Sequence, residues 1–253
     1  LVSRQSSNRP IIANKKLQPY RLLINSKSNL KKKTSNIHYS INPLLGFLAM
    51  FVTQDIVINF FFSEIKIKNK NFSIPTNSSI ILAPTHRSRW DGLVLTKAMG
   101  RRVTNKDCKF MVTKSEMKGI QGWFLRRLGC FSIDQLSPSL SVLRYAVNLI
   151  VKKNQLVVFP EGKINKFGQK LTLKEGLYRL ALLAAKKTNT IFIIPIGIAY
   201  SQVSPKFRGK VSLCFGEPLL INKNPSLSIK DFNETLNKRM HNAEKIALKN
   251  IGR

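Results

Sequence analysis

From residue 63 to the end of the chain, short apolar segments with strand character alternate with longer segments of helical periodicity. The strand candidates are EIKIK (64–68), SIILA (79–83), CKFMVT (108–113), QLVVF (155–159), TIFIIPIGIAY (190–200) and KVSLCFG (210–216). The helix candidates are 90–99, 115–127, 138–153, 174–187 and 227–250. Such alternation is typical of an α/β domain, because each helix returns the chain to begin the next parallel strand. It predicts an α/β fold with a largely parallel, mixed central sheet flanked by helices.

The end of the chain has the pattern of an amphipathic helix. Within 227–250, apolar residues recur at spacings of three and four, at Ile229, Phe232, Leu236, Met240, Ala243 and Ala247. We therefore expect a folded domain over residues 63–221, followed by a C-terminal amphipathic helix in 222–253. No internal repeat is visible.

The chain is strongly basic, with 43 Lys and Arg against 12 Asp and Glu and a net charge of +31. Such a charge attracts nucleic acid, anionic membranes or phosphate-bearing substrates, although an A+T-rich coding sequence would also enrich lysine. Residues 1–40 hold nine basic residues and no acid, and are rich in Ser and Asn. They predict a flexible basic arm, and their composition also resembles a transit peptide.

Residues 41–62 form an apolar lead-in to the folded domain. A membrane-spanning helix needs about 20 predominantly apolar residues. Here Thr53, Gln54, Asp55 and Asn59 interrupt the run, and a charged residue inside lipid is costly. We predict a short helix over 43–54 that lies in or on a bilayer, followed by a strand-like segment. A full span and burial against the protein's own core are the alternatives.

Cysteine usage and common motifs limit the possible chemistry. Cys108, Cys130 and Cys214 are far apart, without metal-binding or redox spacing, which favours a reducing compartment. The sequence contains no HExxH, Walker-type loop, GxSxG or paired CxxC motif. We therefore expect no metal site, no nucleotide cofactor and no serine-hydrolase triad.

Residues 81–92 read ILAPTHRSRWDG, an apolar strand that ends at Pro84 and leads into a helix. In α/β sheets this is where ligands bind, and helix N–H groups there can hold an anion. A carboxylate at Asp91 can fix the imidazole of His86 in the tautomer that accepts a proton from a hydroxyl. The alternative is an ordinary helix start, in which Ser88 caps the helix and Asp91 completes a capping box.

A second strand ends in the same way. Residues 156–162 read LVVFPEG, so that Glu161 and Gly162 follow a buried strand and a proline. This would deliver an acidic side chain to the same edge of the sheet, next to a glycine that lets a ligand approach the backbone. The alternative is a simple turn with Glu161 exposed to solvent.

Taken together, these segments resemble the glycerolipid acyltransferase superfamily, in particular the 1-acyl-sn-glycerol-3-phosphate acyltransferases. The resemblance covers roughly residues 60–221. It is carried by five segments in the family's order: THRSRWD (85–91), GCFSID (129–134), FPEG (159–162), IIPIGIAY (193–200) and CFGEPL (214–219). Several ordered blocks are far more specific than one His-x4-Asp pair, so 63–221 is interpreted as an acyltransferase domain.

The resemblance implies a role for each matching residue. His86 would be the base that deprotonates the acceptor hydroxyl, and Asp91 would orient it. The hydroxyl would then attack an acyl thioester directly, with no cofactor and no acyl-enzyme. Glu161 and Gly162 would hold the glycerol or phosphate end of the acceptor, and Pro195 would belong to the wall of a substrate tunnel.

The sequence departs from the family at three places where the family is typically different. Thr85 stands in place of Asn, Gln135 in place of Arg, and Lys163-Ile164 in place of Thr-Arg. Arg binds phosphate with two hydrogen bonds and Lys does not, so these changes bear on the acceptor. Nearby cations that can substitute are Arg87, Arg89, Arg126, Arg127, Lys163 and Lys166.

We therefore expect an enzyme that acylates the sn-2 hydroxyl of a lysophosphatidate, taking the acyl group from coenzyme A or acyl carrier protein. Its partners would be an anionic membrane surface and a lysophospholipid, at the cytoplasmic or plastid stromal face. The segment 119–131 is either a lipid-gripping amphipathic surface or a core-facing helix. Other acceptors, a catalytically silent relative and a basic nucleic-acid-binding protein are the alternatives, although no nucleic-acid-binding motif is visible and no specific nucleic acid is expected.

Overall fold

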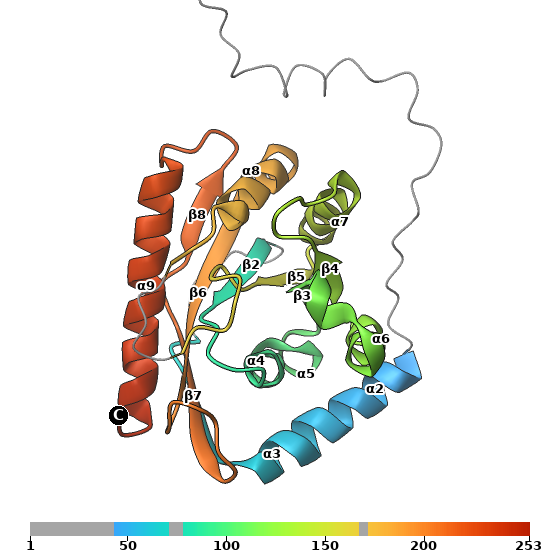
Figure 1. Cartoon of the computed structure of the whole chain (residues 1–253). Helices are drawn as coiled ribbons and strands as arrows, with labels where there is room; N and C mark the ends of the chain where they lie inside the picture. The colour runs from blue at the N-terminus through green and yellow to red at the C-terminus, as the bar shows by residue number, and fades with distance from the viewer. Residues whose placement is uncertain (1–42, 71–77, 167–171) are drawn as a thin grey trace, which may run out of the picture. The chain divides into compact units, whose positions relative to one another are not determined.

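The structure is a computed structural model that describes residues 43–70, 78–166 and 172–253 (Figure 1). The basic arm predicted for residues 1–40 lies outside the described residues.

Eight strands of the described chain form one sheet. They are β1 (Phe62–Lys68), β2 (Ser79–Pro84), β3 (Cys108–Thr113), β4 (Phe131–Ile133), β5 (Gln155–Val158), β6 (Thr190–Tyr200), β7 (Gly209–Phe215) and β8 (Leu219–Asn222). Their order is β1-β7-β6-β2-β5-β3-β4, with β8 also pairing with β6. Only the pairings of β6 with β7 and β8 are antiparallel. The predicted α/β class with a largely parallel, mixed sheet is therefore confirmed.

Helices cover both faces of this sheet, because neighbouring strand residues point to opposite sides. On one side Leu82 and Ile194 pack with α4. On the other, Ile81 and Ile193 pack with α7, α8 and α9. The longer helices are α4 (Asp91–Met99), α6 (Gly119–Arg127), α7 (Leu140–Val151), α8 (Gly176–Thr188) and α9 (Ile229–Asn250). The short helix α5 (Arg101–Thr104) follows α4.

The apolar lead-in is a longer helix than the sequence predicts. It begins as α2 (Pro43–Phe51), continues through a π-helical turn (Val52–Val57) and ends as α3 (Ile58–Phe61), directly before β1. The prediction that it stops at residue 54 is wrong: the helix continues to Phe61, and Thr53 and Gln54 each donate one hydrogen bond within the fold, although Gln54 Oε1 has no partner among the described residues. Thr53 donates to a carbonyl of the preceding turn, and Gln54 donates to the carbonyl of Leu93 on α4.

The C-terminal helix is part of the same core. Ser228 caps α9 by accepting the N–H of Asp231, and Phe232, Leu236 and Met240 are buried against the sheet and α8. Residues 222–253 therefore belong to the folded domain, and a boundary at 221 does not separate them. Figure 1 shows α9 lying along β6 and β7.

Candidate active site

The turn between β2 and α4 is held in place by β6. The Thr85 N–H donates to the Ile196 carbonyl at 2.8 Å, and the Ile198 N–H donates to the Thr85 hydroxyl at 2.9 Å. Thr85 is fully buried. The threonine that departs from the family pattern thus continues the alignment of β2 with β6, and it fixes where the next residue, His86, begins.

The predicted pair of His86 and Asp91 is in hydrogen-bonding contact. His86 Nδ1 lies 2.9 Å from Asp91 Oδ2. The same oxygen accepts the backbone N–H groups of Arg87 and Ser88 at 2.6 and 2.8 Å, and Asp91 is fully buried. The carboxylate is held in one orientation by these three contacts. It therefore favours the tautomer with the proton on Nδ1 and the lone pair on Nε2.

Tyr200, at the end of β6, completes the surroundings of Asp91 and was missed by the sequence analysis. Its hydroxyl donates to Asp91 Oδ1 at 2.6 Å. Burial raises the pKa of Tyr200 well above its usual value, and the charge of Asp91 adds to this rise. The phenol therefore stays protonated and holds the oxygen that does not face His86.

Ser88 is not the N-cap of α4. The residue before the helix is Trp90, which makes no side-chain cap. The Ser88 hydroxyl accepts the Trp90 N–H at 3.2 Å, whereas Asp91 reaches back to the turn's N–H groups. The capping-box interpretation is therefore half right, because its acidic member is present and also serves His86.

Arg87 and Glu161, which the sequence predicts to bind substrate, are buried against each other, and neither lines the described pocket. The Arg87 guanidinium lies 3.0 Å from Glu161 Oε2, and both side chains are buried. A second carboxylate, Glu244 of α9, pairs with the other side of Arg87 at 2.9 Å. The three groups satisfy one another inside the protein, and removing one partner of such a buried pair typically costs about 3–5 kcal/mol.

Their titration follows from this packing. Burial alone would lower the pKa of Arg87, but Glu244 and Glu161 outweigh it and raise that pKa. Burial also raises the pKa of Glu161, although Arg87 and the His86 N–H oppose the rise. Glu161 accepts that N–H at 2.8 Å, so its role in the structure is to position the backbone of His86.

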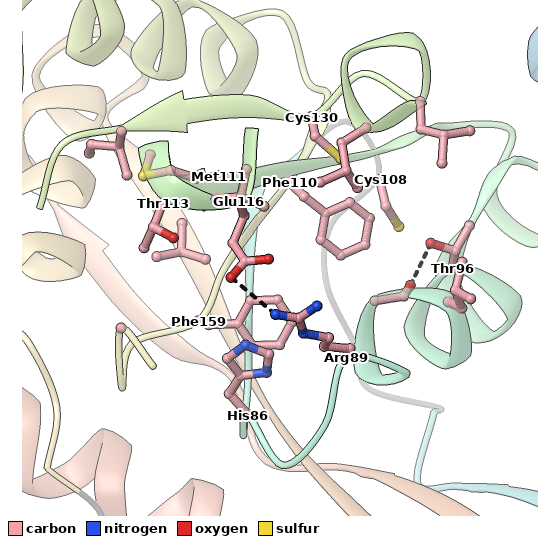
Figure 2. A pocket seen from close by; sticks show the side chains of 18 of the residues that line it. His86, Arg89, Thr96, Cys108, Phe110, Met111, Thr113, Glu116, Cys130 and Phe159 are labelled. Atoms are coloured by element: carbon pink, nitrogen blue, oxygen red, sulfur yellow. Dashed lines mark hydrogen bonds and ion pairs between the residues drawn. The ribbon is translucent and has the colours of Figure 1, made fainter. Parts of the chain in front are cut away.

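An apolar pocket of about 1150 Å³ opens at His86. The His86 ring stacks on Phe159 with a centroid distance of 4.1 Å, and Phe110 lies beyond it (Figure 2). Figure 2 also shows Arg89 reaching toward Glu116. That ion pair is 3.7 Å long and exposed, and such surface pairs contribute only about 0.2–1 kcal/mol. Arg89 can therefore move to a ligand.

The remaining predicted cations divide between the pocket and the surface. Lys163 lines the pocket with Arg89, Gly162 and the unpredicted Lys174. Two predicted residues do not line this pocket: Lys166 is exposed, and Arg126 donates to the Met117 carbonyl at 2.9 Å. The side chain of Arg127 lies outside the described residues.

The turn at Gly162 depends on its glycine and on Gln135. Gly162 has a φ of +70°, which disfavours any side chain. The Gln135 amide donates to the Gly162 carbonyl at 2.7 Å. The residue that replaces the family's arginine thus braces this turn. Pro195 lies inside β6, away from the described lining of the pocket, so the tunnel-wall role expected for it is not supported.

The cysteines on the pocket wall are not reactive thiolates. Burial raises the pKa of both Cys108 and Cys130 to about 12, so neither thiol is ionised near neutral pH. Among the described residues, no group of three His, Cys, Asp or Glu side chains is arranged to hold a metal ion.

The fold and the site define an α/β protein with an imidazole–carboxylate pair at the mouth of an apolar pocket. The profile of the Acyltransferase family matches residues 64–199, more than half of the chain, and the chain belongs to that family. A 1-acyl-sn-glycerol-3-phosphate acyltransferase from Streptococcus pneumoniae is 33% identical over 88 residues, which cover 34% of this chain and 32% of the relative. The matched part is thus about a third of that relative's length.

A solved structure has a similar fold. The crystal structure of the 1-acyl-sn-glycerophosphate (LPA) acyltransferase PlsC from Thermotoga maritima matches with a TM-score of 0.59 and 17% identity. The match covers 81% of this chain and 80% of that chain. At this identity the likeness concerns the fold.

Proposed function

We propose that the protein transfers a fatty acyl group from an acyl thioester to the sn-2 hydroxyl of 1-acyl-sn-glycerol-3-phosphate, forming phosphatidate. The observation that carries the proposal is the His86–Asp91 pair at the mouth of an apolar pocket. Family membership supports acyl transfer, and the named activity of both relatives supports this acceptor.

The step needs one base and no cofactor. His86 Nε2 takes the proton of the acceptor hydroxyl while the oxygen attacks the thioester carbonyl carbon. Collapse of the tetrahedral intermediate breaks the carbon–sulfur bond, and the imidazolium returns the proton to the departing thiolate. Asp91 stabilises the imidazolium through the 2.9 Å contact with Nδ1.

The residues that line the pocket differ between the two faces of the sheet, because neighbouring residues of β3 and β5 point to opposite sides. Beside α4 the lining includes the apolar side chains of Leu93, Cys108, Phe110 and Phe159, with polar groups among them at Gln54, Thr96, Arg101 and Asp107. This side suits an acyl chain. Beside α8 lie Lys163, Lys174 and the Gly162 turn, and this side suits the phosphate of the acceptor.

Lys174 is well placed for that phosphate. Its N–H donates to the Pro160 carbonyl at 2.8 Å, which ties it to the turn that carries Glu161. Its Cγ lies 3.4 Å from the position that a Cβ on Gly162 would take. Together with Lys163 and Arg89, it offers charge-assisted hydrogen bonds in place of the family's two arginines. The anionic thioester donors, coenzyme A or acyl carrier protein, suit the same basic surroundings.

An acceptor screen tests the function. The full chain would be offered a labelled palmitoyl thioester, on coenzyme A or on acyl carrier protein, with lysophosphatidate, glycerol-3-phosphate, lysophosphatidylcholine or monoacylglycerol. We expect labelled phosphatidate, with a kcat/KM about 100-fold lower for monoacylglycerol, because it lacks the charge that the lysines bind. Equal rates with all acceptors would contradict the assignment of lysophosphatidate, and no transfer to any would contradict acyl transfer itself.

The lead-in helix is the surface that we propose contacts the membrane. Its exposed apolar side chains are Leu44, Phe47, Leu48, Phe51, Val52, Ile56 and Phe60. Phe47 also lines the pocket, so a face that rests on lipid would connect to the place where an acyl chain binds. An exposed apolar face bordered by cations is typical of peripheral membrane contact.

None of the helices in the described part of the chain is both long and apolar enough to cross a bilayer.

The β6–β7 loop extends this surface. Phe207 is 57% exposed and packs against Phe60, which is 67% exposed, with a centroid distance of 5.1 Å. Lys206 and Arg208 flank Phe207, and the Arg208 N–H donates to the Phe61 carbonyl at 2.6 Å. Aromatic rings beside cations suit the interface of an anionic bilayer, where each cation contributes roughly 1 kcal/mol.

Replacing Phe60 and Phe207 together with alanine is expected to weaken binding to phosphatidylglycerol-containing vesicles by about tenfold, because two partly exposed rings no longer enter the interface. Vesicle sedimentation measures this. The matched controls are Leu183→Ala on α8 and Leu220→Ala on β8, exposed apolar residues outside this surface. Unchanged affinity of the double variant would show that the loop and the end of α3 do not touch the bilayer.

A further inference from the structure

The C-terminal helix supplies a side chain to the active-site turn. Glu244 of α9 receives both the Nε–H and an Nη2–H of Arg87, the latter at 2.9 Å. Glu244 is 5% exposed and Arg87 is 7% exposed. Glu244 lies well beyond residues 64–199, the part of the chain that matches the family.

Arg87 connects Glu244 to the backbone of His86 through two further residues. Its Nη1 donates to Glu161 Oε2 at 3.0 Å and to the Asn165 carbonyl at 2.9 Å. Glu161 and Asn165 in turn hold the backbone of His86, since the His86 N–H donates to Glu161 at 2.8 Å and the Asn165 N–H donates to the His86 carbonyl at 2.7 Å. The backbone on both sides of the imidazole therefore depends on where the Arg87 guanidinium is held.

A glycine lets α9 come close enough to make this contact. A Cβ on Gly197, in the middle of β6, would lie 2.1 Å from the Glu244 nitrogen and 2.3 Å from the Ala243 carbonyl carbon. The helix backbone thus rests directly on the strand at the residue that carries the carboxylate. Gly197 belongs to β6, the strand that hydrogen-bonds to Thr85 and ends at Tyr200. Both α9 and the active-site turn are therefore held in place by the same strand.

Few of the acidic side chains of this protein are buried, and those few lie close to His86. The sequence has 12 acidic residues, and all of them lie in described segments. Only Asp91, Glu161 and Glu244 among them are buried. A chain with a large excess of cations thus places each of its buried carboxylates within one or two contacts of His86. Burying a carboxylate is costly unless it is paired and hydrogen-bonded. The partner of Glu161 and Glu244 is the guanidinium of Arg87, next to the base, and Asp91 is held by His86 and Tyr200.

From these contacts we infer that Glu244 is a positioning residue for acyl transfer: it holds Arg87, and through Glu161 and Asn165 it sets the place of His86. The inference rests on the proposed function for its kinetic consequence alone. Its structural consequence, a His86 ring fixed against Asp91, can be measured without any substrate.

The test compares Glu244→Gln with Glu234→Gln, which makes the same chemical change at an exposed position of the same helix. We expect Glu244→Gln to lower kcat about 100-fold, as for a misplacement of about 1 Å, with KM for both substrates little changed. The control should match the unaltered protein. Glu244→Asp keeps the charge but is one methylene shorter, so an intermediate loss is expected.

A proton NMR readout separates positioning from other effects. An imidazole N–H bonded to a carboxylate gives a far-downfield resonance, assigned here by its loss in His86→Ala. We expect that resonance in the unaltered protein and in Glu234→Gln, and its loss or broadening in Glu244→Gln. Glu244→Gln should also melt at a lower temperature, because a buried charge loses its partner, so the spectra are compared well below the melting temperature of each variant. If Glu244→Gln does not fold, Glu244→Asp carries the test. Wild-type kcat in the folded variant, or a lowered kcat with the resonance intact, would overturn the inference. A protein that transfers no acyl group but shows the NMR changes would refute only the proposed function.

Discussion

Replacing His86 with alanine is expected to lower kcat for acyl transfer by about 10²- to 10⁴-fold, the contribution typical of a positioned general base. The imidazole is the group at the pocket mouth that is oriented by a buried carboxylate at 2.9 Å, and a methyl group cannot accept the proton of the acceptor hydroxyl. KM should change little, because the ring lines only the entrance. Release of free thiol from the acyl donor, followed with lysophosphatidate as acceptor, measures the rate.

The control for this prediction is His241→Ala, which removes the exposed histidine of α9 and should leave kcat unchanged. Both variants should unfold at temperatures close to that of the unaltered protein, since the His86 side chain is partly exposed. Turnover near the wild-type rate in His86→Ala would mean that another group accepts the proton, and the proposed mechanism would be wrong.

The sequence predicts those parts of the fold whose pattern is long and regular. The strands β3 and β6 have the predicted bounds, 108–113 and 190–200, because a buried strand is a continuous apolar run between polar turns. The strand β4 has only three residues and was missed, since so short a run has no periodicity. The helix expected over 115–127 is divided, because Gly119 adopts a φ of +57° that breaks the helical path.

The His86–Asp91 contact was predictable because it is local. Two side chains five residues apart, across the start of a helix, can meet whatever the rest of the chain does. Tyr200 and Glu244 lie more than 100 residues away from Asp91 and Arg87 along the chain, and only the pairing of β6 with β2 and the packing of α9 bring them there. No local pattern marks either residue.

Arg87 shows a different limit of prediction from the sequence. In a chain with 43 cations, any arginine near the motif is a reasonable candidate for binding phosphate. What decides the role of Arg87 is burial against two carboxylates, one from the β5–α8 loop and one from α9. The lysine at 174, by contrast, becomes a candidate because its backbone is tied to the Pro160 turn, although it lies beyond the motif.

Replacing Asp91 with asparagine is expected to lower kcat by about 10³-fold while leaving the shape of the site nearly unchanged. In the native site Asp91 Oδ2 accepts from His86 Nδ1 and from two backbone N–H groups, and Oδ1 accepts from Tyr200. An amide can keep an oxygen toward only one of these sides. Because three donors meet Oδ2 and only the Tyr200 hydroxyl meets Oδ1, the amide oxygen is expected to stay toward His86, with the NH₂ donating to the Tyr200 oxygen. The neutral amide no longer stabilises the imidazolium that forms when His86 takes the hydroxyl proton, and this loss of charge lowers kcat.

Tyr200→Phe is the matched comparison, because it removes one hydrogen bond to the same carboxylate and keeps the negative charge beside His86. Its kcat should fall only about tenfold, since a hydrogen bond to a charged group contributes about 1.5–3 kcal/mol and Asp91 keeps its other donors. Steady-state kinetics and thermal unfolding of both variants decide the question. If Asp91→Asn and Tyr200→Phe lose activity equally, then the carboxylate acts by holding the turn together, and stabilising the imidazolium by its charge is not its main contribution.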